Sequence, residues 1–320
     1  MSWLESWLTT QWYARKQPNF LLRVFASIYH QLLRFQKPQN TEKLGAPIIV
    51  VGNFTVGGTG KTPLIIAIIN YLKQHGFRPG VVSRGYARQS KDPISVMPDT
   101  HVRDSGDEPL LISKRVNAPV RVDANRKQAA QFLIQHGCDI IVSDDGLQHR
   151  NLPREIEIEV IDEHRGYGNG RLLPAGPLRE PVRAVSMQVR NASLVDDEHS
   201  FAMQLNMQHC VQLNGTVTRS LTDFSGQSIF ALAGIGHPQR FFAALETFNI
   251  HVTGIALSDH QLISLADFPA QGTVFVTEKD AVKCADIKRD DVWVVPVHAQ
   301  LSDRFYTQLM QKILIAQEAV

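Results

Sequence analysis

The stretch from Ala46 to Thr62, APIIVVGNFTVGGTGKT, decides the fold. Its first residues form an apolar, β-branched run of strand length, and its last residues form a glycine-rich loop that ends in Lys61 and Thr62. A helical pattern follows as far as about Gln74. A buried strand, a glycine-rich loop and a helix in this order predict a phosphate-binding loop, because glycines let backbone N–H groups surround phosphate oxygens at a helix N-terminus.

The loop departs from the usual G-x-x-x-x-G-K-[ST] pattern at its first position, which is Thr55. We expect Lys61 to reach the β- and γ-phosphates of ATP, and the Thr62 hydroxyl to bind Mg²⁺. The predicted nucleotide-binding residues of the loop are Thr55, Val56, Gly57, Gly58, Thr59, Gly60, Lys61 and Thr62. The alternative is a chance glycine-rich turn, which the strand–loop–helix context disfavours.

Two adjacent carboxylates, Asp144 and Asp145, end a second buried strand at residues 139–143. Two acids at the end of a buried strand are costly without a cation. We therefore predict that one carboxylate holds Mg²⁺, directly or through water, and that its neighbour orients water or substrate during catalysis. The alternative is a pair of turn aspartates.

Strands and helices alternate on both sides of this core, which predicts an α/β fold with a P-loop NTPase-type parallel sheet flanked by helices. Four further strand candidates after residue 226, separated by helical patterns, predict a second, smaller α/β lobe. We expect N-terminal amphipathic helices over 1–38, the P-loop core over 39–200, linking antiparallel strands over 201–226 and the smaller lobe over 227–320. The last helix is free to return to the core.

The net charge of +2 is unevenly distributed. Residues 1–50 hold six basic and two acidic residues, a net +4, which leaves −2 for residues 51–320. The same segment holds Trp3, Trp7 and Trp12, three of the four tryptophans. Amphipathic helices with tryptophan and basic residues lie in membrane interfaces or cover the protein core. No run of 18 apolar residues exists, so the sequence predicts no membrane-spanning helix.

Composition excludes other classes of protein. A hydrophobic fraction of 43% and a charged fraction of 20% predict a real core and exclude wholesale disorder. Cys138, Cys210 and Cys284 form no CxxC pair, which excludes a zinc ribbon or disulfide scaffold and fits thiols in a reducing compartment. No basic stripe interleaved with aromatic residues lies outside residues 1–43, so we expect no nucleic-acid partner.

Several longer motifs follow one another in a fixed order. They are VGNFTVGGTGKTP (51–63), SRGY (83–86), GDEP (106–109), DDGLQH (144–149), GNG (168–170), LPAGPLRE (173–180), DHQ (259–261) and TEKDAVK (277–283). Together they closely resemble the tetraacyldisaccharide 4′-kinases, the lipid A 4′-kinases of Gram-negative bacteria. The resemblance runs from the N-terminal helices to about residue 283. DDGLQHR with LPAGPLRE is more specific than any phosphate loop.

The resemblance implies transfer of the γ-phosphate of ATP, with Mg²⁺, to the 4′-hydroxyl of a tetraacyldisaccharide 1-phosphate in lipid A synthesis. It places the protein peripherally at the cytoplasmic face of the bacterial inner membrane, with the N-terminal helices as the membrane-associating element. This favours the interface reading of those helices. The implied partners are the lipid substrate and the membrane surface, with no obligatory protein partner.

The resemblance also implies a catalytic carboxylate–histidine pair, Asp107 of GDEP and His260 of DHQ, contributed by different lobes. A sugar hydroxyl needs a positioned proton acceptor. We expect Asp107 to accept the proton and His260 to tune it, with the reverse assignment also open because a coupled pair titrates as a unit. The alternatives are a helix N-cap for Asp107 and a packed or capping histidine for His260.

Other motif positions are assigned around this pair. Glu108 is predicted to assist Mg²⁺ or the pair, and Tyr86, with Arg84, lies near the expected sugar position. The resemblance assigns His149, Arg179 and Glu180 to substrate binding or organisation of the site.

Two of the assigned residues have explicit alternatives. Arg179 either binds the 1-phosphate of the substrate or fixes its loop through an ion pair with Glu180 or Asp162. Lys279 either approaches the nucleotide phosphates from the second lobe or is a surface lysine.

An alternative function comes from the loop itself. GGTGKT also resembles the loops of ParA- and MinD-like ATPases, whose signature lysine is replaced here by Val56. A membrane-associated P-loop ATPase or switch of this type is the second reading, and it needs neither LPAGPLRE nor DHQ.

Overall fold

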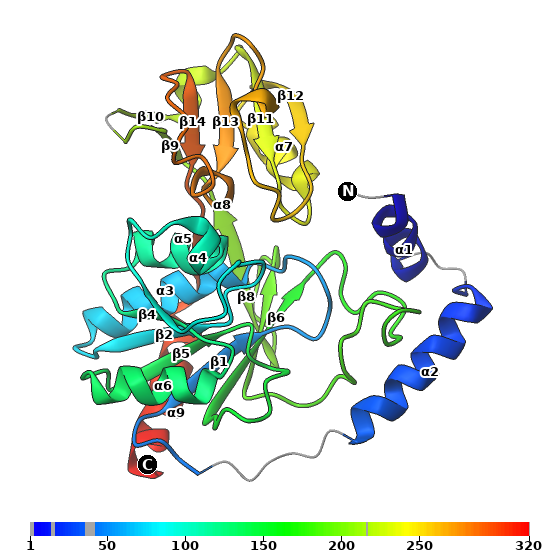
Figure 1. Ribbon diagram of the computed structural model, residues 1–320, viewed down its shortest axis with the longest axis vertical. Helices are drawn as coiled ribbons and strands as arrows, with labels where there is room; N and C mark the ends of the chain where they lie inside the picture. The colour runs from blue at the N-terminus through cyan, green and yellow to red at the C-terminus, as the bar shows by residue number, and fades with distance from the viewer. Residues whose placement is uncertain (1–2, 14–16, 36–41, 216, 320) are drawn as a thin grey trace.

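The computed structural model of the chain describes residues 3–13, 17–35, 42–215 and 217–319 (Figure 1). The predicted boundary between residues 38 and 39 and the side chain of Trp3 lie outside this description. Two sheets organise the molecule, a large one in the body and a small one in a lobe that stands above it in the view of Figure 1.

The large sheet carries the strand that precedes the phosphate loop. In the described part of the chain its members are β1 (Ile48–Gly52), β2 (Pro79–Ser83), β3 (Ile94–Val96), β4 (Val120–Val122), β5 (Ile140–Asp144), β6 (Ile156–Asp162), β7 (Met187–Asn191), β8 (Ser200–Asn206) and β15 (His298–Leu301). Their order is β15-β8-β7-β6-β1-β5-β2-β4-β3. The strands from β8 to β4 run parallel, and β15 and β3 pair antiparallel at the two edges.

Both faces of the large sheet are covered. Its helices are α3 (Lys61–Gln74), α4 (Val102–Ser105), α5 (Asp107–Arg115), α6 (Arg126–Gln135) and α9 (Asp303–Ala319). Ile49 and Val51 of β1 join one apolar core with residues of α3, α5 and α9, whereas Ile48 and Val50 join another core with α6. Successive side chains of a strand point to opposite faces, which is why IIVV is apolar at every position. The predicted fold class is confirmed.

The smaller lobe has its own sheet and core. Among the described residues its strands are β9 (His209–Gln212), β10 (Thr218–Ser220), β11 (Ser228–Ala233), β12 (His251–Ala256), β13 (Val274–Thr277) and β14 (Val292–Val295), in the order β10-β9-β14-β13-β11-β12. Helices α7 (Pro238–Glu246) and α8 (Glu278–Ala281) and the short 3₁₀ helices η1 (Leu221–Phe224) and η2 (Leu265–Asp267) belong to it. Phe224, Phe275 and Trp293 pack edge to face in its core.

Residues 201–226 are divided between the two sheets rather than forming one set of linking antiparallel strands. β8 pairs parallel with β7 in the body, because Phe201 and Met203 pack into the body core beside Phe305 of α9. β9 and β10 pair antiparallel in the smaller lobe. The chain returns to the body through β15 and α9, so the smaller lobe is an insertion between β8 and β15.

Two N-terminal helices, α1 (Trp3–Tyr13) and α2 (Phe20–Phe35), lie beside the body, on the right in Figure 1. The indole Nε1 of Trp12 donates to the carbonyl of Pro174 at 2.9 Å, and the Tyr29 hydroxyl donates to the carbonyl of Arg179 at 2.7 Å. Both acceptors belong to the LPAGPLRE segment. Within the described residues, no helix has the length and apolar character needed to cross a bilayer.

Candidate active site

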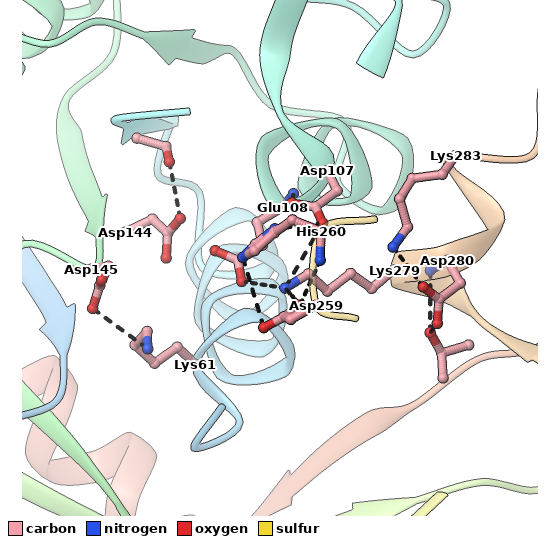
Figure 2. Close-up of polar contacts among 12 residues, drawn as sticks. Lys61, Asp107, Glu108, Asp144, Asp145, Asp259, His260, Lys279, Asp280 and Lys283 are labelled. Atoms are coloured by element: carbon pink, nitrogen blue, oxygen red, sulfur yellow. Dashed lines mark hydrogen bonds and ion pairs between the residues drawn. The ribbon is translucent and has the colours of Figure 1, made fainter. Parts of the chain in front are cut away.

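The phosphate loop connects β1 to α3, and its glycines adopt backbone angles that other residues rarely reach. Gly57 has φ 108°, and Gly60, which caps α3, has φ 95°. Lys61 begins α3, and its ammonium donates to Asn53 Oδ1 at 3.0 Å. The same ammonium lies 3.4 Å from Asp145 Oδ1 (Figure 2). The loop therefore presents backbone N–H groups and one fixed ammonium at a helix N-terminus, as phosphate binding requires.

Two buried asparagines that the sequence reasoning missed hold this loop in shape. Asn53 Nδ2 donates to the carbonyl of Thr55 at 2.7 Å, and Asn191 Nδ2 donates to the carbonyl of Thr59 at 2.9 Å. Asn191 ends β7 at the same sheet edge as the loop, which was a usable signal because ligands bind at the carboxyl edge of parallel strands.

The LPAGPLRE segment lies directly against the loop. The N–H of Val56 donates to the carbonyl of Pro177 at 2.9 Å, and the N–H of Arg179 donates to the carbonyl of Phe54 at 2.7 Å. The motif that made the resemblance specific is thus a support for the phosphate loop.

Asp144 is a buried carboxylate at the end of β5, next to β1. One oxygen accepts the Ser83 hydroxyl at 3.0 Å, and the other, Oδ1, has no hydrogen-bond partner among the described residues. Burial, followed by the negative charges of Glu108 and Asp145, raises the pKa of Asp144 to about 7. A buried carboxyl group in this state is neutralised either by a proton or by a cation.

Asp145 is charged more easily than Asp144. Burial raises its pKa, but the Lys61 ammonium and the Arg179 guanidinium outweigh burial and hold that pKa far below its usual range. Arg179 Nη1 donates to Asp145 Oδ2 at 2.7 Å. Arg179 therefore does form an ion pair, but with Asp145 and with neither Glu180 nor Asp162.

A buried arginine missed from sequence lies behind the two aspartates. Arg126 Nη2 donates to the backbone carbonyls of Asp144 and Asp145, at 3.0 Å each. Little in the sequence indicated this role, because Arg126 is simply the first residue of a predicted helix, α6.

Asp107 and His260 meet across the two lobes. Asp107 begins α5 of the body, and His260 follows β12 of the smaller lobe. Their Oδ2 and Nδ1 atoms are 2.9 Å apart (Figure 2). Although burial favours the neutral forms, the hydrogen bond to His260 and the charge of Lys279 lower the pKa of Asp107, and the bond to Asp107 raises the pKa of His260.

Lys279 of α8 lies among three carboxylates. Its ammonium is 3.1 Å from Glu108 Oε1, 3.1 Å from Asp259 Oδ1 and 3.8 Å from Asp107 Oδ2. Burial lowers its pKa, but the charges of Glu108, Asp107 and Asp259 raise it well above the ordinary value. Lys279 is therefore not a free surface lysine, and Glu108 is engaged by an ammonium.

The residues assigned to the substrate lie at different depths. Tyr86 is 67% exposed, and its ring centroid is 4.9 Å from that of His260. Glu180 is buried and accepts from Gln148 Nε2 at 3.0 Å. His149 is half-buried, and burial together with Arg126 and Arg154 lowers its pKa to about 4. Tyr86 is thus exposed, whereas Glu180 is buried and His149 is half-buried.

A turn of the smaller lobe covers the phosphate loop, a contact that sequence reasoning missed. A Cβ placed on Gly236 would lie 3.2 Å from the backbone N of Gly58. The turn is fixed by buried Asp280, which accepts the N–H of Gly234 at 2.9 Å and pairs with Lys283 at 2.6 Å (Figure 2). Part of TEKDAVK therefore positions this turn.

Kinases of the P-loop class place the phosphate loop at the carboxyl edge of a parallel sheet and a metal-binding aspartate at the end of the neighbouring strand. β1 and β5 have this relation, so fold and site define a P-loop kinase. A family profile described as tetraacyldisaccharide-1-P 4′-kinase matches residues 18–314. The chain belongs to this family.

Relatives support the same assignment. A tetraacyldisaccharide 4′-kinase of Stenotrophomonas maltophilia is 42% identical over 322 residues, covering 94% of this chain and 95% of the relative. One of Xylella fastidiosa is 44% identical over 283 residues, covering 84% of each. The crystal structure of LpxK from Aquifex aeolicus in complex with ATP has a TM-score of 0.76 and 25% identity, covering 90% of this chain and 97% of that one.

The predicted activity is thereby confirmed. The protein is an ATP-binding kinase that acts on the 4′ position of a tetraacyldisaccharide 1-phosphate in lipid A biosynthesis. The ParA/MinD-type switch is set aside, because the family match spans the body and the smaller lobe.

Proposed function

We propose that Asp107 takes the proton of the 4′-hydroxyl. His260 holds the Asp107 carboxylate in position and adjusts its pKa. The observation that carries this proposal is the 2.9 Å contact between Asp107 Oδ2 and His260 Nδ1. The lowered pKa of Asp107 keeps its carboxylate charged at neutral pH, as a proton acceptor must be. Because each lobe supplies one member, the hydroxyl is activated only where the lobes meet, which limits transfer to water.

We assign the phosphates of ATP to the loop from Thr55 to Thr62. Lys61 stabilises the charge that develops on the transferring group, and its contacts with Asn53 and Asp145 hold the ammonium in place before the reaction. Lys279 approaches this region from the smaller lobe and ties Glu108 and Asp259 to the proton-accepting pair.

We assign Mg²⁺ to Thr62, Asp144 and Asp145. The unpartnered Oδ1 of Asp144 and the raised pKa of that residue fit a cation. Among the described residues there is no cluster of three or more metal-binding His, Cys, Asp or Glu side chains. Mg²⁺ in kinases is held by one or two protein groups together with the phosphates and water. When bound, it neutralises phosphate charge.

We infer that Tyr86 and His149 contact the sugar and that Glu180 orders the loops beneath it. Tyr86 is exposed beside His260, where an acceptor hydroxyl must lie for Asp107 to reach it. Arg179 acts through Asp145, since its guanidinium is already bound to that carboxylate.

We propose that α2 lies on the cytoplasmic face of the inner membrane, where the acylated substrate resides. No described residue of α2 is buried. One side exposes a continuous apolar stripe made of Leu21, Val24, Phe25, Ile28, Leu32 and Phe35. Arg23 and Arg34 flank this stripe, a composition that suits an anionic membrane surface.

A vesicle flotation assay tests the membrane proposal. Phe25→Glu with Leu32→Glu should abolish binding to vesicles that contain anionic lipid, because two charges would enter the apolar face. Ser27→Glu with His30→Glu adds the same charge on the polar side, where Arg23 and Arg34 lie, and should reduce binding far less. Equal binding by both double variants would contradict the assignment.

A transfer assay with γ-labelled ATP and tetraacyldisaccharide 1-phosphate in detergent micelles tests the site. His260→Ala should lower kcat by about 10²-fold or more while nucleotide affinity is retained. Turnover near the wild-type value would remove His260 from the mechanism.

In this proposal each part of the molecule has one task. The body binds ATP, the smaller lobe completes the catalytic pair, and the N-terminal helices bind the membrane.

A further inference from the structure

Arg165, in the turn after β6, lies beside the phosphate loop but has no place in the site as described so far. Gly57, the third residue of the loop pattern, is in the left-handed region, and a Cβ built on it would lie 3.7 Å from Arg165 Nη1. The guanidinium is therefore at the rim of the loop that is predicted to wrap the phosphates of ATP.

The charge of this guanidinium reaches Asp162, whose pKa is lowered because Arg240 and, to a smaller extent, Arg165 outweigh the effect of burial. Among the described residues, Arg165 forms no ion pair, and no side-chain hydrogen bond from it is found. The neighbouring carboxylate, Asp162, is committed elsewhere: its Oδ1 accepts Arg240 Nη2 at 2.7 Å and also the backbone N–H of Arg165 at 3.0 Å. A half-buried guanidinium that makes no ion pair among the described residues, beside a phosphate loop, has donors left for a phosphate oxygen.

An aromatic ring holds Arg165 at this position. The guanidinium lies over the ring of Tyr13, at the end of α1, 5.2 Å from the ring centroid. Tyr13 is kept in place by its neighbour Trp12, whose carbonyl accepts the N–H of Asn169 at 2.8 Å. Stacking on an aromatic face fixes a guanidinium while leaving its N–H groups free to donate.

We propose that Arg165 is a further catalytic residue, which donates to the transferring γ-phosphoryl group of ATP, and that Tyr13 is its positioning residue. This rests on the proposed phosphate role of the loop. In the reaction the 4′-oxygen forms a bond to the γ-phosphorus, the bond from that phosphorus to the β–γ bridging oxygen breaks, and the hydroxyl proton goes to Asp107. In the transition state charge is spread over the three equatorial oxygens of the transferring group, and Arg165 stabilises it there as an arginine supplied within the same chain.

The proposal is tested with Arg165→Ala and Arg165→Lys in the full-length enzyme, assayed for transfer to lipid and for binding of ADP. Arg165→Ala should lower kcat by about 10²- to 10³-fold with ADP affinity unchanged. Arg165→Lys should recover only part of the loss, because an ammonium lacks the guanidinium's planar donor geometry. Arg78→Ala, which removes a 73% exposed guanidinium at the opposite edge of the sheet, is the control and should keep full activity.

Tyr13→Leu tests the positioning role of Tyr13 separately from the catalytic role of Arg165. It should lower kcat by about 3- to 30-fold, the loss of one cation–π contact, and less than Arg165→Ala does. A loss in Tyr13→Leu equal to that in Arg165→Ala, or wild-type kcat in Arg165→Ala, would overturn the proposal. Lys61→Ala distinguishes a failure of the Arg165 proposal from a failure of the phosphate role of the loop. If Lys61→Ala is inactive while Arg165→Ala is normal, only the assignment of Arg165 fails. If Lys61→Ala itself is normal, the phosphate role of the loop fails.

Discussion

The phosphate loop and the Asp107–His260 pair are built in opposite ways. The loop is one continuous segment between β1 and α3, and its shape follows from glycines and from neighbours at one sheet edge. The pair joins residues 153 positions apart, one from the body and one from the smaller lobe. A change in the loop should therefore act on nucleotide binding and chemistry together, whereas a change in the pair should act on chemistry alone.

Asp107→Asn should have the largest effect and should leave nucleotide binding intact. An amide cannot accept the hydroxyl proton, so kcat should fall by about 10²- to 10⁴-fold. Single-turnover transfer to lipid measures the chemistry, and calorimetric titration with ATP measures binding. Asp139→Asn, which removes a surface carboxylate paired with Arg78, should be unaffected in both. Loss of ATP affinity in Asp107→Asn would contradict the claim that the pair acts on chemistry alone.

Lys61→Ala should fail in both measurements. Removing a fixed donor to the transferring group should lower kcat by about 10²- to 10³-fold, and the loss of a phosphate contact should also weaken ATP binding. The same titration and transfer assays report the two effects. Normal ATP affinity combined with lost turnover would mean that Lys61 contacts only the transition state. The loop would then resemble the Asp107–His260 pair in acting on chemistry alone.

The sequence was sufficient for what depends on neighbours along the chain. It predicted β1, the loop, α3 and the aspartates that end β5, because apolar strand runs and glycine turns are local signals. It was insufficient for Asn191, Arg126 and the Gly236 turn, whose roles arise from contacts between distant segments. The pair itself was reached through family resemblance, and no pattern in the sequence joins residue 107 to residue 260.

The place of β8 shows the same limit. Its alternation of apolar and polar residues predicted a strand, but alternation does not say which sheet a strand joins. Phe201 and Met203 settle that by packing into the body core.

Arg240→Met should reduce stability more than catalysis. Arg240 of α7 pairs with Asp162 at the end of β6, so this contact joins the lobes without touching the reacting groups. Truncation leaves a buried carboxylate short of a partner and should cost about 1–3 kcal/mol of unfolding free energy. Thermal unfolding measures it, with Arg78→Met as the matched surface pair, which should change little. Equal shifts in the two variants would contradict an inter-lobe role.

The pH dependence of stability should carry the smallest signal. The lowered pKa of Asp107 contributes stability above its unfolded value of about 3.9, and this is lost as the pH falls through the folded value. The raised pKa of His260 contributes stability below its unfolded value of about 6.5, and this is lost as the pH rises through the folded value. The two contributions coexist between these limits.

The melting temperature therefore should respond to His260→Gln more at pH 6 than at pH 9. Thermal melts of the wild type and the variant across this range measure the difference. A constant difference between them at all pH values would mean that the pair carries no charge-dependent bond.

A double-mutant cycle on kcat with Asp107→Asn and His260→Ala tests most directly whether the two lobes build one proton-accepting unit. Groups that act as a unit show strongly non-additive losses. We predict that the double variant transfers phosphate within about tenfold of the slower single variant. Losses that multiply, so that each substitution acts in full on top of the other, would contradict a shared unit.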